Sequence, residues 1–230
     1  MLNKSFVNTL NKLNSITDKV ILRYPVTTVS SDAGDMIANI DVSLLDSDHF
    51  EEIGIYELSK FISLVSLFGE YSVKRQENEL IISSDNNTAV YLTSDVFLLK
   101  HNDKSADVIT RLDSFPTVAE FDLDLNTIKN FNKASSIFGD LEGLNFKSED
   151  SNITVSLTKI NRFESSGNSY TKTFRDCSQK NFDLNISTAN FNKLPVMDYK
   201  VKVKYNEQRD AYRIVFETDV FKVIIAQLAW

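Results

Sequence analysis

Apolar residues recur every three or four positions in four segments of the chain, the spacing of amphipathic helices. The clearest segment places Leu58, Phe61, Ile62 and Val65 on one face, and Gly69 is positioned to end it. Ser5 and Asp124 are predicted N-caps, and Pro195 is predicted to stop the last segment. The predicted helices lie within Lys4–Ile16, Gly54–Phe68, Leu125–Ile137 and Thr188–Leu194.

Most of the remaining chain alternates apolar with polar residues over short runs, which predicts strands with one face toward water. The turn around Gly34, between Asp32 and Asp35, is typical of a hairpin. Few helices and many short strands favour an α+β fold with antiparallel sheets. The predicted strands include Val20–Leu22, Met36–Val42, Tyr71–Lys74, Leu80–Ser83, Val90–Thr93, Ile153–Leu157, Tyr199–Lys204 and Tyr212–Glu217.

The order of these elements repeats along the chain. Phe6–Ile16 resembles Thr127–Ile137 in pattern and composition, and three predicted strands follow both Leu58–Val65 and Ala189–Leu194. Each half therefore reads helix, strands, helix and three strands. We expect two tandem copies of one domain, at residues 1–95 and 123–230, joined by an extended polar connector at 96–122.

Composition narrows the class of protein. The 230 residues are 42% hydrophobic, enough for a core, and the single cysteine, Cys177, excludes an internal disulfide. The sequence has no secretory leader pattern and no apolar run of about 20 residues, so a soluble cytoplasmic protein is expected. The net charge of -7 by itself argues against a nucleic-acid partner.

The distribution of charge reverses that inference. The four predicted helices contain one acid, Glu57, where the average density of the chain would give about six or seven. One helix of this kind is an ordinary solvated face; four together favour a polyanionic neighbour, because Lys, Asn and Ser contact phosphates without reading bases. The candidate DNA-binding residues are Lys4, Asn8, Asn11, Lys12, Lys60, Asn126, Lys129, Lys133 and Lys193, with Asn190 on the same face of the last helix.

No catalytic motif is present: the sequence lacks a Gly-rich phosphate loop, GxSxG, HExxH and CxxC. Cys177 with His49 or His101 would make a nucleophile pair, but a structural thiol is the favoured interpretation. The acids around His49 are better explained as a solvated loop than as a cation site; they are Asp46, Asp48, Glu51 and Glu52. We expect no enzyme, no cofactor and no metal.

Taken together, the tandem order and acid-poor helices resemble the DNA polymerase sliding clamps, and within the proliferating-cell-nuclear-antigen-like superfamily those of T-even-type bacteriophages. The resemblance covers essentially the whole chain, although the connector and the C-terminus depart from the phage pattern. The segments that carry it are Lys12–Leu22, Ala38–Val42, Ile55–Leu67 and Asn185–Asn190.

This resemblance implies a homotrimeric ring that encircles double-stranded DNA without sequence preference and tethers the DNA polymerase. It implies loading by an ATP-driven clamp loader, activation of viral late transcription with the host RNA polymerase, and a location in the cytoplasm of an infected bacterium. Subunits would join through the edges Val90–Thr93 and Tyr170–Asp176. Partner peptides would enter an apolar pocket near Met36, Leu112, Phe115, Ala226 and Leu228.

Two other classes stay open on the sequence. A non-encircling, two-domain protein-interaction scaffold would share the repeat without binding DNA. An enzyme of unrecognised type is disfavoured by the missing motifs.

Overall fold

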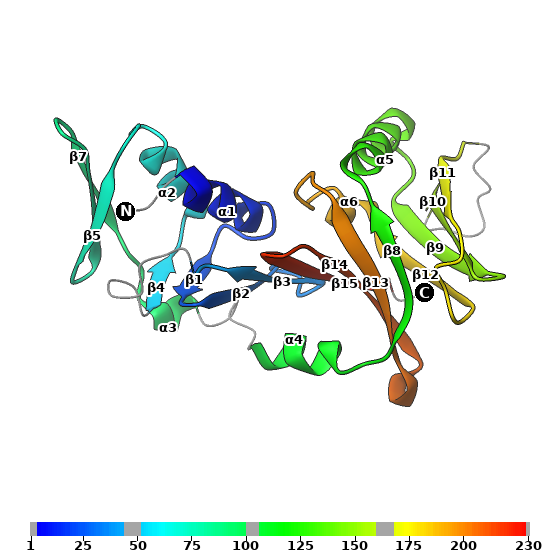
Figure 1. Cartoon of the computed structure of the whole chain (residues 1–230). Helices are drawn as coiled ribbons and strands as arrows, with labels where there is room; N and C mark the ends of the chain where they lie inside the picture. Colours follow the sequence, from blue (N-terminus) through cyan, green and yellow to red (C-terminus); the bar gives the residue numbers. More distant parts are fainter. Residues whose placement is uncertain (1–3, 44–51, 100–105, 160–167, 229–230) are drawn as a thin grey trace. The chain divides into compact units, whose positions relative to one another are not determined.

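The computed structural model describes residues 4–43, 52–99, 106–159 and 168–228 (Figure 1). The chain divides into two compact units, Met1–Ile109 and Thr110–Trp230. Helix α4 (Ala106–Asp113) contains the boundary between them.

In its described part, unit 1 has two principal helices and seven strands, all paired antiparallel. Strand β1 pairs with β4 and β2 with β3, while β5, β6 and β7 form a three-stranded sheet. The elements are α1 (Lys4–Asn14), β1 (Val20–Arg23), β2 (Val26–Ser30), β3 (Met36–Asp41), β4 (Glu52–Ile55), α2 (Leu58–Val65), β5 (Ser72–Gln76), β6 (Glu79–Ser83), β7 (Thr88–Leu92) and the short α3 (Val96–Leu99).

Unit 2 contains two antiparallel sheets, β11–β10–β9–β12 and β8–β13–β14–β15. The elements are β8 (Thr117–Leu123), α5 (Leu125–Phe138), β9 (Gly143–Glu149), β10 (Asn152–Thr158), β11 (Thr171–Phe174), β12 (Phe182–Ser187), α6 (Thr188–Phe191), β13 (Tyr199–Asn206), a 3-10 turn (Glu207–Arg209), β14 (Ala211–Glu217) and β15 (Phe221–Ala226).

The internal repeat is present in the structure. Both units run helix, four strands, helix and three strands, and β8 precedes this series in unit 2. The pairing repeats as well: β1–β4 corresponds to β9–β12, β2–β3 to β10–β11, and β5–β6–β7 to β13–β14–β15. The chain is therefore an α+β protein made of two similar domains with antiparallel sheets, as the sequence predicted.

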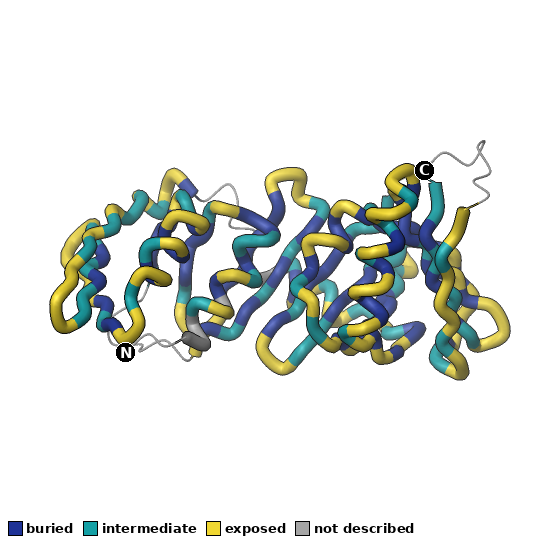
Figure 2. The backbone as a smooth tube through the Cα atoms, turned by 90° about the horizontal axis from the view of Figure 1, so that it is seen from above, coloured by how far each residue is buried: buried dark blue, intermediate teal, exposed yellow. Residues whose placement is uncertain are grey.

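Along several strands every second side chain is buried, and the buried side chains of each helix lie on one face. These side chains form the core of each unit. In β10 the side chains of Ile153, Val155 and Leu157 are buried and their neighbours are not. In unit 2, Phe191 of α6 packs against Phe131 of α5 and Phe216 of β14, with ring centroids 6.1 and 6.0 Å apart. The backbone tube in Figure 2 shows buried and exposed stretches alternating along the chain.

Several local predictions were wrong. The connector is not extended: it contains α3 and α4, and β8 belongs to the sheet of unit 2. Helix α1 begins at Lys4, so Ser5 lies inside it rather than at its cap, and α2 ends at Val65 with Ser66 as its C-cap, before Gly69. The hairpin turn is confirmed, since Gly34 has φ of 70° and donates its N–H to Ser31.

Within the described residues, no helix has the length and apolar character needed to cross a membrane.

Candidate nucleic-acid interface

Helices α1 and α2 of unit 1 pack against each other, and their exposed sides are polar. Leu10 and Leu13 of α1, like Phe61 and Val65 of α2, are buried. Asn8 and Asn11 are exposed and Lys12 is half-buried, and their contact with DNA stays a prediction. The backbone of Lys4 begins the helix, but its side chain lies outside the described residues.

Helix α5 carries the polar face of unit 2. Ile128, Phe131 and Ala134 are buried on one side, whereas Asn126, Lys129 and Lys133 are exposed. Lys129 and Lys133 are four residues apart and so lie on the same face, where like charges destabilise an isolated helix by roughly 0.2–0.5 kcal/mol. A phosphate backbone beside this face would remove that repulsion.

Helix α6 is shorter than predicted, ending at Phe191, and its polar residues separate. Asn190 is only 5% exposed, so its assignment to the DNA-facing side is wrong: the helix turns it into the core beside Phe191. Lys193 lies two residues beyond the helix and is exposed.

The four helices that repeat between the units, α1, α2, α5 and α6, hold 37 residues (11, 8, 14 and 4), with five lysines and no Asp or Glu. Glu57 is the N-cap residue of α2 and not part of the helix. The Glu57 carboxylate forms an ion pair with the Lys60 ammonium, with Oε1 and Nζ 2.6 Å apart. This contact raises the pKa of Lys60. Among the candidate DNA-facing lysines whose side chains the structure describes, Lys60 is the one that is ion-paired with an acid.

Three acids hold the N-termini of α2 and α5. The Asp18 carboxylate accepts the Ser59 N–H of α2 at 2.7 Å, and the Asp198 carboxylate accepts the Leu125 N–H of α5 at 2.7 Å. Asp124, the predicted cap, accepts the Thr127 N–H at 2.8 Å and its hydroxyl at 2.7 Å, which lowers the pKa of Asp124. Capping explains these carboxylates without a separate ligand.

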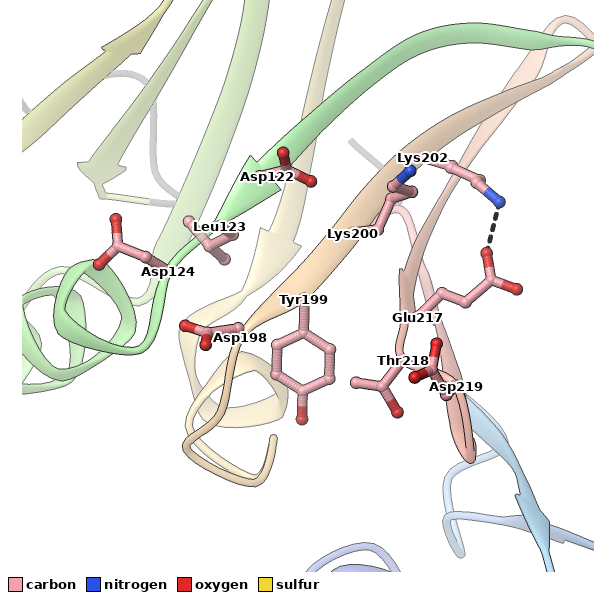
Figure 3. Close-up of a pocket in the computed structure, with 10 residues that line it drawn as sticks. All are labelled: Asp122, Leu123, Asp124, Asp198, Tyr199, Lys200, Lys202, Glu217, Thr218 and Asp219. Carbon is pink, nitrogen blue, oxygen red and sulfur yellow. Dashed lines mark hydrogen bonds and ion pairs between the residues drawn. The ribbon is translucent and has the colours of Figure 1, made fainter.

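A pocket of about 650 Å³ opens beside the N-terminus of α5, between the ends of β8 and β13 and the β14–β15 turn (Figure 3). It does not coincide with the lysine-bearing faces. Five acids outnumber the two lysines in its wall, and Lys202 is ion-paired with Glu217. Its negative walls repel phosphate. The lining residues are Asp122, Leu123, Asp124, Asp198, Tyr199, Lys200, Lys202, Glu217, Thr218 and Asp219.

Strands β7 and β11 are among those that end a sheet without a second neighbour in the described part of the chain. Strand β7 pairs with β6 alone, and β11 pairs with β10 alone. Val90 and Leu92 of β7 are 52% and 70% exposed. Strand β11 lies within one of the segments predicted to join subunits, and β7 overlaps the other. Unpaired edges of this kind associate readily.

The five residues predicted for a partner pocket have different environments. Met36 is fully buried at 0% exposure, because the alternation of β3 turns it inward with Ala38 and Ile40. It is a core residue of unit 1 and not open to a partner, so its placement in the pocket was wrong. The other four residues are half-buried in or beside unit 2: Leu112, Phe115, Ala226 and Leu228.

The alternative chemistry finds no support in the described residues. Burial raises the pKa of the half-buried Cys177 thiol, whereas a thiolate nucleophile needs a lowered pKa. His49, His101, Asp46, Asp48 and Glu51 lie outside the described residues, and Glu52 is ion-paired with Arg23. Across the described ranges, no three His, Cys, Asp or Glu side chains gather as a metal site would require.

No protein-family model and no curated protein matches the sequence. Solved structures match the fold. The beta chain of DNA polymerase III from Streptococcus pneumoniae is 14% identical with a TM-score of 0.65, over 98% of this chain and 63% of that one. A. fulgidus PCNA, bound to the C-terminal region of FEN-1, is 11% identical with a TM-score of 0.67, over 97% and 95%. The Helicobacter pylori beta clamp bound to a DNA ligase peptide is 12% identical with a TM-score of 0.64, over 98% and 64%.

This chain thus spans less than two thirds of the bacterial beta chains and nearly all of the A. fulgidus PCNA. At these identities the similarity establishes the fold, which is that of the DNA sliding clamps.

Proposed function

We propose that this chain is one subunit of a ring that encircles double-stranded DNA and tethers the DNA polymerase to it. The observation that carries the proposal is the absence of Asp and Glu from α1, α2, α5 and α6, although the chain has 32 acids. The clamp fold supports the proposal. In this chain the pair of acid-free helices occurs twice, as α1 and α2 and as α5 and α6.

The physical demand on such a surface is attraction without tight binding. A ring must hold the duplex yet slide, so it needs diffuse contact with phosphates and no base reading. Exposed lysines and asparagines meet that demand when they contact phosphate oxygens, because those contacts carry no base sequence. The acids concentrated elsewhere on the chain would keep DNA away from other surfaces.

Ring closure is proposed to occur through β7 of one subunit and β11 of the next. A head-to-tail contact of this kind closes into a ring when the rotation between copies permits it. Three copies, each with two similar units, give six domains around the duplex. The exposed Val90 and Leu92 on β7 would be covered in that contact.

Tethering would follow from topology. A polymerase bound to an encircling ring stays near the primer terminus, which is an effective-concentration gain without new DNA contacts. Similar structures hold peptides of FEN-1 and DNA ligase, which supports a peptide-binding partner surface here, near Leu112, Phe115, Ala226 and Leu228. Opening by an ATP-driven loader, a phage origin with the infected host's cytoplasm as its location, and late-transcription activity with the host RNA polymerase are further parts of the proposal.

Encirclement can be tested without a loader, on linear duplex DNA with biotin at both ends. The chain is incubated at high concentration in low salt, and streptavidin is then added to block the ends. We expect retention through a later salt wash only when streptavidin is added after the protein, because an encircling ring cannot pass a blocked end. Equal retention in both orders, or release in both, contradicts encirclement.

The helix face is tested by reversing charge. Lys129→Glu with Lys133→Glu should lower DNA affinity at least about tenfold and flatten its dependence on salt, because each lost phosphate contact removes about 0.9 from the slope. The matched control is Lys147→Glu with Lys200→Glu, which makes the same charge change on strands of the same unit. An equal loss in both doubles would show that net charge alone, and not the α5 face, binds the DNA.

A further inference from the structure

The end of the connector is fastened to the sheet of unit 2 by a buried lysine. Lys204 of β13 is 8% exposed, and its Nζ donates to the backbone carbonyls of Asp113 at 3.0 Å and Phe115 at 3.3 Å. These two acceptors lie at and just beyond the C-terminal end of α4. A single cation therefore holds both ends of a three-residue segment.

A lysine in this position needs explanation, because burying an ammonium group is costly unless acceptors replace its water. Lys200 and Lys202 alternate with Lys204 on the same strand and face, yet their side chains are 52% and 26% exposed and pair with carboxylates. Lys204 instead meets two backbone carbonyls. Hydrogen bonds from a charged donor are stronger than those between neutral groups, so the two carbonyls replace the water that the ammonium group loses.

Neighbouring contacts hold the same segment. The Lys222 ammonium donates to the Asp113 carboxylate at 2.8 Å and is also ion-paired with Glu217 at 3.1 Å. The backbone N–H of Tyr205 donates to the Pro116 carbonyl at 3.1 Å. Residues 113–116 are thus bound by β13 through side chain and backbone, and by β15 through Lys222.

We propose that Lys204 is a positioning residue, which sets the place of Leu112 and Phe115 by holding the carbonyls of Asp113 and Phe115 on the sheet. Both apolar side chains are half-buried and flank the anchored segment. The partner surface assigned to them rests on the proposed function; the anchoring does not. With Lys204 in place, a partner meets a fixed apolar pair and does not have to order the connector when it binds.

The exposed Arg111, in the last turn of α4, gives a direct readout, since trypsin cleaves after it only when the helix end opens. In the full-length protein, Lys204→Met should raise the rate of cleavage at Arg111 about tenfold or more, with parallel loss of hydrogen-exchange protection at residues 113–116. Lys204→Arg, which restores charged donors, should recover part of the protection. Lys200→Met is the matched control and should leave the rate at the wild-type value.

Asp113→Ala provides a second variant if Lys204→Met does not fold, because it frees the same segment from Lys222 at an exposed position. We expect a smaller increase, about threefold. Wild-type cleavage rates in both Lys204→Met and Asp113→Ala, or equal acceleration in Lys200→Met, would overturn the anchoring.

The positioning role is read from affinity for the replicative DNA polymerase of the same source. Lys204→Met should weaken it several-fold and Lys200→Met should not. Faster cleavage with unchanged polymerase affinity would overturn the positioning role. Absence of polymerase binding by the wild type would instead count against the proposed function, with the cleavage rates still reporting the anchor.

Discussion

At Gly54 the backbone of β4 passes too close to a neighbouring carbonyl for any side chain. A Cβ at this position would lie 2.4 Å from the Ser94 carbonyl oxygen and 3.0 Å from Leu99 Cδ1. The Ser94 N–H also donates to the Gly54 carbonyl at 2.9 Å, which joins the segment after β7 to β4. Because Gly54 has no side chain, the backbones of Gly54 and Ser94 can approach closely enough to form this hydrogen bond.

We expect Gly54→Ala to destabilise the protein by about 1–3 kcal/mol, because backbone must move to admit the methyl group. Urea unfolding followed by circular dichroism measures this. Gly69→Ala is the control: a Cβ there meets nothing within 4 Å, so it should be neutral or slightly stabilising. A neutral Gly54→Ala would show that the close approach is not a constraint.

Helix α5 is stabilised at its N-terminus by Asp124, its N-cap residue. Asp124 was predicted as its cap from residue type and position alone, and the structure confirms the cap through the hydrogen bonds of Thr127. Those bonds favour the ionised carboxylate and lower its pKa in the folded state. The stabilisation is therefore present above the unfolded pKa of about 3.9, and is lost as pH falls through the lower folded pKa.

Asp124→Ala should cost about 1 kcal/mol at pH 7, the usual value of an N-cap, and the difference from wild type should shrink toward pH 2–3. Urea midpoints at the two pH values test this. Asp122→Ala removes an exposed acid two residues earlier, on β8, and should change little at either pH. A pH-independent cost for Asp124→Ala would contradict the assigned role of the carboxylate.

Over the whole molecule, the net charge of -7 is a sum that hides how the charges are distributed among the elements. The repeated helices carry five lysines and no acid, so the mean charge misrepresents the face proposed to meet DNA. The sheet edges at β7 in unit 1 and β11 in unit 2 are the corresponding feature proposed for assembly.

Assembly is tested at the β7 edge. Val90→Lys with Leu92→Lys places two charges on an exposed apolar edge and should give a monomer by light scattering at concentrations where the wild type is a trimer. Val196→Lys changes a residue of comparable exposure, 44%, in the turn after α6, and should keep the wild-type mass. A monomeric wild type, or a double variant of unchanged mass, would contradict the proposed interface.

The amino-acid pattern by itself determined the helices α1, α2 and α5, most strands, the tandem repeat and the fold class, because local periodicity dictates which face of each element is buried. It missed α3, which is four residues long and apolar at every position, and the eight-residue α4. It also placed Met36 in a partner pocket and Asn190 on the DNA-facing side, although both are buried.

Only the tertiary structure decided these environments, since burial and hydrogen bonding depend on what packs against an element from elsewhere in the chain. Lys204 is the clearest case. In the sequence it is one of three lysines that alternate with apolar residues, a pattern that predicts a strand face exposed to water. In the fold it is buried, because the connector crosses it and supplies two carbonyl acceptors from 89 and 91 residues away.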